Sequence, residues 1–147
     1  MEIKAYFGCG LTHAPAEFTK EVEDFKNHLR NQLGIILFDF VGLENGTAVD
    51  VYKHDIHRCV KHCDFMIGDF TFPSTGLGWE AGVVVEKHKK PFLGIAQQDA
   101  KVTRLVLGAE CDMNPLFQFI RYQTLSEIIP HVEKIVSVYR KQLVLFN

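Results

Sequence analysis

Two acids that surround a glycine-rich segment could carry chemistry in this chain. Asp69 ends an apolar run, and Glu80 follows residues 73–78, which read Pro-Ser-Thr-Gly-Leu-Gly. A strand, a glycine loop and a helix start together present backbone amides to a small, usually anionic ligand. A carboxylate in that opening would repel a phosphate. Glu80 is therefore interpreted as a reagent rather than as an anchor for phosphate.

Asp55 is a third candidate acid. It is predicted to lie on a mostly buried helix face, one turn before Cys59. Because an unpaired carboxylate is expensive to bury, such an acid usually has a partner or a function. The alternative for Asp55 is a solvated helix charge, and for Glu80 an acid that only complements the helix dipole. Two carboxylates across a cleft suit cleavage of a glycosidic bond, in which one attacks the anomeric carbon and the other handles a proton.

Five strands and five helices are predicted to alternate along the chain. The strands are residues 2–7, 35–41, 65–70, 91–96 and 116–121, and the helices are residues 18–33, 49–63, 79–89, 102–107 and a last one from about 124. This order indicates a single α/β domain over residues 1–147, a three-layer sandwich around a mostly parallel five-stranded sheet of flavodoxin-like or Rossmann-like type. Right-handed crossovers then place Tyr6, Asp69 and Glu80 at carboxyl ends of strands.

Several local features are predicted from periodicity and turn chemistry. Residues 35–41 are nearly all apolar, which is typical of a strand covered on both faces. Thr124 with Glu127 resembles a capping box, and Pro130 implies that the last helix starts near Ile129 or kinks there. Other expectations are a buried stripe of Phe18, Val22, Phe25, Leu29 and Leu33, a C-cap at Gly34, a turn at Asn45-Gly46-Thr47, and a second stripe of Val49, Tyr52, Ile56, Cys59, Val60 and Cys63.

Composition limits the partners. A net charge of -2 on 147 residues gives no electrostatic reason to expect a nucleic acid polymer or an acidic membrane. No apolar run approaches the roughly 20 residues of a membrane span, and the charged start is not a signal peptide. The four cysteines lack a secreted-scaffold spacing, so reduced thiols and a cytoplasmic protein are expected.

A metal site on the cysteine- and histidine-rich helix is weighed and set aside. Ligands three or four residues apart could share a helix face, as His54 and His57 do, or Cys59, His62 and Cys63. No CxxC or HExxH motif accompanies them, and the cysteines fit the apolar stripe. Core cysteines with surface histidines are expected, with no metal and no cofactor.

Four local motifs resemble those of the nucleoside 2-deoxyribosyltransferase superfamily, and within it most those of the 2'-deoxynucleoside 5'-phosphate N-hydrolases. The resemblance covers about residues 3–139. It is carried by Tyr6-Phe7 before a glycine loop, by His54-Asp55-Ile56, by the block of residues 73–82 (PSTGLGWEAG), and by Lys101-Val102-Thr103-Arg104 running to Gly108-Ala109.

The resemblance implies a role for each matched residue. Glu80 would attack C1' of the sugar to form a glycosyl-enzyme intermediate, Asp55 would position the sugar and assist protonation of the departing base, and Tyr6 would orient the nucleophile or the sugar. Thr103 would offer a hydroxyl to the substrate of a neighbouring subunit, so a homodimer is expected. The substrate-binding candidates are Gly8, Cys9, Gly10, Asp69, Ser74, Gly76, Gly78 and Thr103, with Cys9 as a small loop residue near the ligand rather than a nucleophile.

Two positions bear on the substrate that the resemblance implies. Ser74 stands where the base-exchanging transferases carry an aspartate, and with Thr103 it favours hydrolysis of a nucleoside 5'-monophosphate. Residues 8–13 lack the arginine of the hydrolases, which leaves His13, Lys20 or Arg104 as the cation, and Trp79 replaces the usual tyrosine or methionine. The alternatives are base exchange between deoxynucleosides and a nucleotide-binding sensor without turnover.

Overall fold

One parallel sheet organises the chain. The computed structural model describes residues 2–40 and 46–145. Five strands lie in the order β2-β1-β3-β4-β5, and all four neighbouring pairs are parallel. The strands are β1 Lys4–Cys9, β2 Ile36–Phe38, β3 Phe65–Asp69, β4 Phe92–Gln97 and β5 Phe117–Tyr122. The predicted α/β three-layer fold is confirmed.

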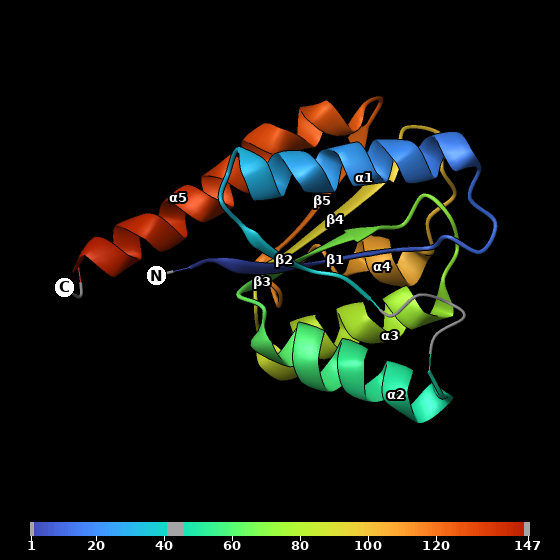
Figure 1. Ribbon diagram of the computed structural model, residues 1–147, viewed down its shortest axis with the longest axis horizontal. Coiled ribbons are helices and arrows are strands. Elements are labelled where there is room, and N and C mark those ends of the chain that lie inside the picture. The colour runs from blue at the N-terminus through green and yellow to red at the C-terminus, as the bar shows by residue number, and fades with distance from the viewer. Residues whose placement is uncertain (1, 41–45, 146–147) are drawn as a thin grey trace.

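Helices cover both faces of this sheet (Figure 1). One face carries α1 (Ala16–Asn31) and α5 (Ile129–Leu145), and the other carries α2 (Ala48–Tyr52), α3 (Thr75–Gly82) and α4 (Arg104–Gly108). The helix begun by α2 continues as a π-helical segment, Lys53–Val60, and α3 continues as another, Val83–His88. None of the helices in the described part of the chain is both long and apolar enough to cross a bilayer.

The strand order creates a crevice between β1 and β3. From β1 the chain moves to one side to form β2 and to the other side to form β3, β4 and β5. In open α/β sheets ligands bind where the order reverses, outside the carboxyl ends of the strands. Gly8 pairs with Gly68 and Cys9 with Asp69 at that end. The fold therefore points to this crevice before any side chain is considered.

The alternation along β1 decides which residues face each helical layer. Ala5 and Phe7 belong to the core packed under α1 and α5, whereas Tyr6 belongs to the core packed under the α2 and α3 helices. The side-chain period of two in a strand sends neighbours to opposite faces. Tyr6, which is fully buried, therefore points toward the helix that carries Glu80.

Two buried-face predictions are wrong. Strand β2 is only three residues long and half-buried, because it is an edge strand with a neighbour on one side only. Val49 and Tyr52 are 59% and 48% exposed, although the rest of their stripe is buried. Periodicity identifies the face of a helix but not where the sheet beneath it ends. Val41 and Asn45 of the predicted strand and turn lie outside the described residues.

The first and last helices follow their predicted signals closely. Helix α1 buries Phe18, Val22, Phe25 and Leu29 but ends at Asn31, so Leu33 lies beyond it. Gly34 is not the cap, which is Gln32, yet its φ of +63° is a conformation that favours glycine. The capping box of Thr124 and Glu127 is confirmed; it opens a 3₁₀ turn, Leu125–Ile128, and α5 begins at Ile129.

Candidate active site

The structure brings together Tyr6, Asp55 and Glu80, which come from three separate elements. The Tyr6 hydroxyl donates a hydrogen bond to Glu80 Oε1 at 3.1 Å. A second side-chain hydrogen bond joins Glu80 to Asp55. All three residues are buried, and Glu80 is 8% exposed. Two acids and one phenol thus form a single hydrogen-bonded group at the crevice.

Burial and proximity change the acidity of this group. Burial, and then the charge of neighbouring Asp55, raise the pKa of Glu80 from 4.5 to about 8. Burial and the nearby Glu80 carboxylate raise the pKa of Tyr6 well above its usual range, so this phenol stays a hydrogen-bond donor. We therefore expect the Glu80 carboxyl to hold its proton near neutral pH in the free protein.

The helix that carries Glu80 begins earlier than predicted. Ser74 is its N-cap, with the Ser74 hydroxyl accepting a hydrogen bond from the Leu77 amide at 3.2 Å, and α3 starts at Thr75. The serine cap offsets part of the low helix propensity of the glycines that follow it. Glu80 consequently lies in the second turn, not the first. Burial, rather than the helix start, is the main influence on the acidity of Glu80.

Two cavities meet at the carboxylate pair. The first has a volume of about 250 Å³ and the second of about 290 Å³. Their linings share Val51, Asp55, Gly76 and Glu80. The first cavity is otherwise lined by Tyr6, Gly8, Cys9, Leu11, Thr12, Phe40, Ser74 and Leu77, and the second by Ala48, Tyr52, Ile56 and Trp79.

Gly8 and Cys9 line the first cavity near the end of β1, whereas Gly10 of the same predicted loop does not. A Cβ atom on Gly8 would lie 2.9 Å from Leu77 Cδ1 and 3.2 Å from Glu80 Oε2. A Cβ on Gly10 would lie 2.7 Å from the carbonyl oxygen of Phe72. Gly8 and Cys9 belong to strand β1 rather than to the predicted loop. Burial raises the pKa of Cys9 to about 12, so it remains a thiol, as its interpretation as a small lining residue requires.

Asp69 lies on the other face of the sheet from Tyr6. Asp69 alternates with Phe65 and Ile67 along strand β3, so its side chain points to the same face as theirs, the face that packs under α1 and α5. Its carboxylate accepts a hydrogen bond from the Tyr122 hydroxyl at 2.5 Å and from the Thr71 amide at 2.9 Å, and burial raises its pKa. Asp69 is fully buried and lines neither cavity at the carboxylate pair.

Two other predicted binding residues also lie apart from the carboxylate pair. Thr103 is exposed and caps α4, accepting a hydrogen bond from the Leu105 amide at 3.4 Å. Gly78 is exposed, and a Cβ built on it would meet nothing within 4 Å. Neither residue lines the two cavities. Their roles in substrate binding stay predictions.

Sequence reasoning missed the contact between His54 and Asp55. His54 Nδ1 lies 2.9 Å from Asp55 Oδ1, and Cys59 Sγ lies 3.6 Å from the same nitrogen. Donor atoms of these three residues lie within 4.8 Å of one another, a group that could hold a metal ion. The spacings of three and four residues that place side chains on one face of an α-helix do not include the pair His54 and Cys59, because the π-helical segment brings residues five apart together. In the structure His54 orients the Asp55 carboxylate.

A buried lysine next to the site was missed as well. Lys26 is 4% exposed, and its Nζ lies 2.8 Å from Asp39 Oδ1. The same ammonium lies over the rings of Phe7 and Phe40, and Phe40 lines the first cavity. The signal was present, because Lys26 follows Val22 by four residues and so shares its buried face.

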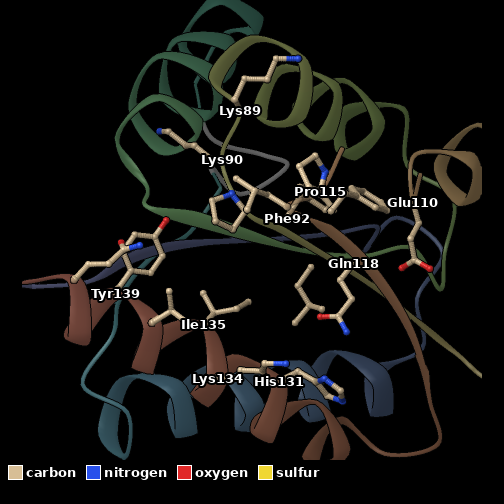
Figure 2. Close-up of a pocket in the computed structure, with 16 residues that line it drawn as sticks. Lys89, Lys90, Phe92, Glu110, Pro115, Gln118, His131, Lys134, Ile135 and Tyr139 are labelled. Carbon is tan, nitrogen blue, oxygen red and sulfur yellow. The ribbon is translucent and has the colours of Figure 1, made fainter. Parts of the chain in front are cut away.

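A larger cavity lies at the opposite end of the sheet. Its volume is about 880 Å³, and it is lined by the first residues of β4 and β5 and by side chains of α5, including Ile135 and Tyr139 (Figure 2). The acid in its lining is Glu110, whose carboxylate accepts a hydrogen bond from the Phe119 amide. None of the residues predicted for the active site lines it.

Comparison with solved structures identifies proteins of similar fold. The CMP N-glycosidase BcmB of Clostridium botulinum matches with a TM-score of 0.63 and 16% identity, over 88% of this chain and 98% of that one. The lysine decarboxylase LdcF of Francisella novicida matches with a TM-score of 0.58 and 13% identity, over 92% of this chain but only 17% of that one. No family model and no curated protein matches the sequence.

At these identities the likeness shows the fold alone. The chain has the three-layer architecture of a nucleotide N-glycosidase over nearly the full length of that protein. A segment of the same fold also occurs in a much larger decarboxylase. The fold accommodates more than one chemistry, and the side chains at the crevice must decide between them.

Proposed function

We propose that this chain hydrolyses the N-glycosidic bond of a nucleoside 5'-monophosphate through a covalent intermediate on Glu80. The observation that carries the proposal is the buried Glu80 carboxyl, held between the Tyr6 hydroxyl and Asp55 at the junction of two cavities. The shared fold with a CMP N-glycosidase supports it. So does the resemblance of residues 73–82 to the nucleophile block of the deoxyribosyltransferase superfamily.

In the first step Glu80 attacks C1' of the sugar. The C1'–N bond breaks, its electron pair moves to the base nitrogen, and Asp55 supplies the proton of the departing base. As Glu80 attacks, its own proton passes to Asp55 through the hydrogen bond between the two side chains. The Tyr6 hydroxyl, which stays protonated, holds one Glu80 oxygen in place.

In the second step water attacks C1' of the glycosyl ester. Asp55, now a carboxylate, takes a proton from this water, and the ester bond to Glu80 breaks to release the sugar phosphate. The carboxyl groups of Glu80 and Asp55 touch each other, which leaves no space for the water that an inverting mechanism places between its two acids. Retention of configuration is therefore expected.

The first cavity suits the sugar and its phosphate. Ser74 and the first turn of α3 border it, and the first amides of a helix have no acceptor within the helix. The candidate cations from the sequence do not line it: His13 and Arg104 are exposed, and Lys20 pairs with Asp24 on the surface of α1. Amides and a hydroxyl are thus the proposed phosphate ligands in this subunit.

Substituting Ser74 tests the phosphate site. Ser74→Asp is expected to lower kcat/KM for a nucleoside monophosphate at least about tenfold relative to the free nucleoside, because a carboxylate repels the phosphate. Aspartate and asparagine are both good N-caps, so helix α3 is preserved in either variant. Ser74→Asn, which adds no charge, serves as the control. An unchanged ratio of kcat/KM values in Ser74→Asp would contradict a phosphate beside Ser74.

Substituting Gly8 tests the position of Glu80. Gly8→Ala is expected to lower kcat by about 10- to 100-fold, because the new methyl group must displace Leu77 or the Glu80 carboxylate. Gly82→Ala adds the same group in helix α3 where nothing lies within 4 Å, and should keep the activity while stabilising the helix by about 0.5–1 kcal/mol. Base release and thermal melts measure both effects. Full activity in Gly8→Ala would show that Glu80 has another position during the reaction.

We also propose that the enzyme is a homodimer in which α4 lies at the interface. Leu105 is 84% exposed and Leu107 38% exposed on this short helix, immediately after Thr103. A second copy covering these leucines would bring Thr103 toward a neighbouring site. Light scattering is expected to give twice the subunit mass, with dissociation in Leu105→Asp. A monomer at all concentrations would remove the role of Thr103.

The direct test is incubation with a panel of ribo- and deoxyribonucleoside monophosphates, followed by chromatography of free bases. Release of one base, with matching formation of the sugar phosphate, supports hydrolysis. If an added second base is converted to a new nucleotide instead, the activity is base exchange. Absence of release from every member of the panel would reject the hydrolase and leave a nucleotide-binding sensor.

A further inference from the structure

The second cavity differs chemically from the first. Apart from the two shared carboxylates, its side chains are those of Ala48, Val51, Tyr52, Ile56 and Trp79, without any cation. The two aromatic side chains remain open to solvent, Trp79 at 63% and Tyr52 at 48%. The first cavity instead offers Ser74, Thr12 and the start of a helix. The second cavity is therefore apolar and aromatic, the first is polar, and the carboxylate pair lines both.

Neither cavity alone has the size of an ordinary ligand site. At about 250 Å³ and 290 Å³, each falls just below the ~300 Å³ at which such sites begin. Gly76 lines both cavities, and a Cβ atom on it would lie 3.9 Å from Ser74 Oγ. A ligand with one polar part and one flat apolar part would fit the two cavities together.

Resting on the proposed function, we propose that the second cavity is the nucleobase subsite and that Trp79 and Tyr52 stack against the base. The bond to be cleaved must lie beside Glu80 and Asp55, and these two residues line both cavities. When the sugar and phosphate lie in the first cavity, the base extends past the carboxylate pair into the second cavity. Stacking on aromatic side chains recognises any base by its flat face, so this subsite supplies binding more than selectivity.

Trp79 offers a direct test because it is the only tryptophan in the chain. The Glu80→Gln variant, which should bind without turnover, is titrated with a nucleoside monophosphate and with the corresponding sugar 5-phosphate while tryptophan emission is recorded. Quenching that saturates with the nucleotide but not with the sugar phosphate is the expected result. Tryptophan emission that stays constant as the nucleotide is added would overturn the proposal, whether or not the wild-type enzyme releases base. Emission that changes only with protein concentration, as when a second subunit covers Trp79, would overturn it too.

Kinetics separate loss of the base contact from general damage. Trp79→Leu and Tyr52→Leu are each expected to raise KM for the nucleotide about fivefold or more. The inhibition constant of the sugar 5-phosphate should not change, and Trp79→Phe should restore most of the affinity. Leu116→Ala, an exposed apolar residue at the far cavity, serves as the control. Equal weakening of nucleotide and sugar phosphate in Trp79→Leu would show that Trp79 supports the fold or an interface instead. If the wild type releases no base while the nucleotide still quenches Trp79, the hydrolase fails and the base subsite stands.

Discussion

Replacing Glu80 with glutamine should lower kcat for base release by at least about 10³-fold. Glutamine keeps the shape of the side chain and an oxygen that can accept the Tyr6 hydrogen bond, but its amide cannot form the glycosyl ester. The measurement is the rate of free-base formation under saturating nucleotide. In the wild type, rapid quenching followed by mass spectrometry should detect the sugar phosphate attached to the peptide that contains Glu80.

Glu86→Gln is the matched control for that loss. Glu86 lies six residues further along the same helix, its side chain is 70% exposed, and it pairs with Lys89 at 3.6 Å on the surface. Its substitution should leave kcat within about twofold, because exposed ion pairs contribute little. Activity that survives in Glu80→Gln would place the nucleophile elsewhere and reject the proposed mechanism.

Replacing Glu80 with glutamine should also stabilise the folded protein at alkaline pH. The pKa of Glu80 rises from 4.5 to about 8 on folding, so the folded state retains a proton that the unfolded state releases. Its contribution to stability is therefore complete below about pH 4.5 and is lost as the pH rises through about 8. Glutamine never ionises. Relative to wild type, Glu80→Gln should gain stability progressively from pH 5 to 8, by on the order of 4 kcal/mol at the upper end.

Urea unfolding of both proteins at several pH values measures this difference. The free energies of unfolding should nearly coincide at pH 4 and diverge toward pH 8.5, while Glu86→Gln follows wild type throughout. Curves for wild type and Glu80→Gln that stay parallel would mean that Glu80 ionises normally in the folded protein. The expected divergence is the stability cost of holding an ionisable nucleophile in a buried site.

Most of the architecture could be predicted because strand and helix periods are local properties. The Phe18–Leu29 stripe and the capping box of Thr124 and Glu127 both involve neighbours within a few residues. The start of α3 was missed because the glycines at 76 and 78 suggested a loop, while the stronger local signal was the cap at Ser74. The exposure of Tyr52 and the short β2 could not be predicted, since they depend on where the sheet ends.

The sequence by itself determined the order of elements, the acids available for chemistry and, through the block around Glu80, the expected nucleophile. The family resemblance also implied Asp55 as the partner of Glu80, and the tertiary structure shows that the two carboxyl groups are in contact. The register of β3 turns Asp69 toward Tyr122, on the face away from Tyr6, whereas a π-helical segment brings Asp55 against Glu80. The tertiary structure also set the acidity of Glu80. Burial and contact between charges arise from the packing of segments that are distant in the chain, so no local pattern could have shown that its pKa rises.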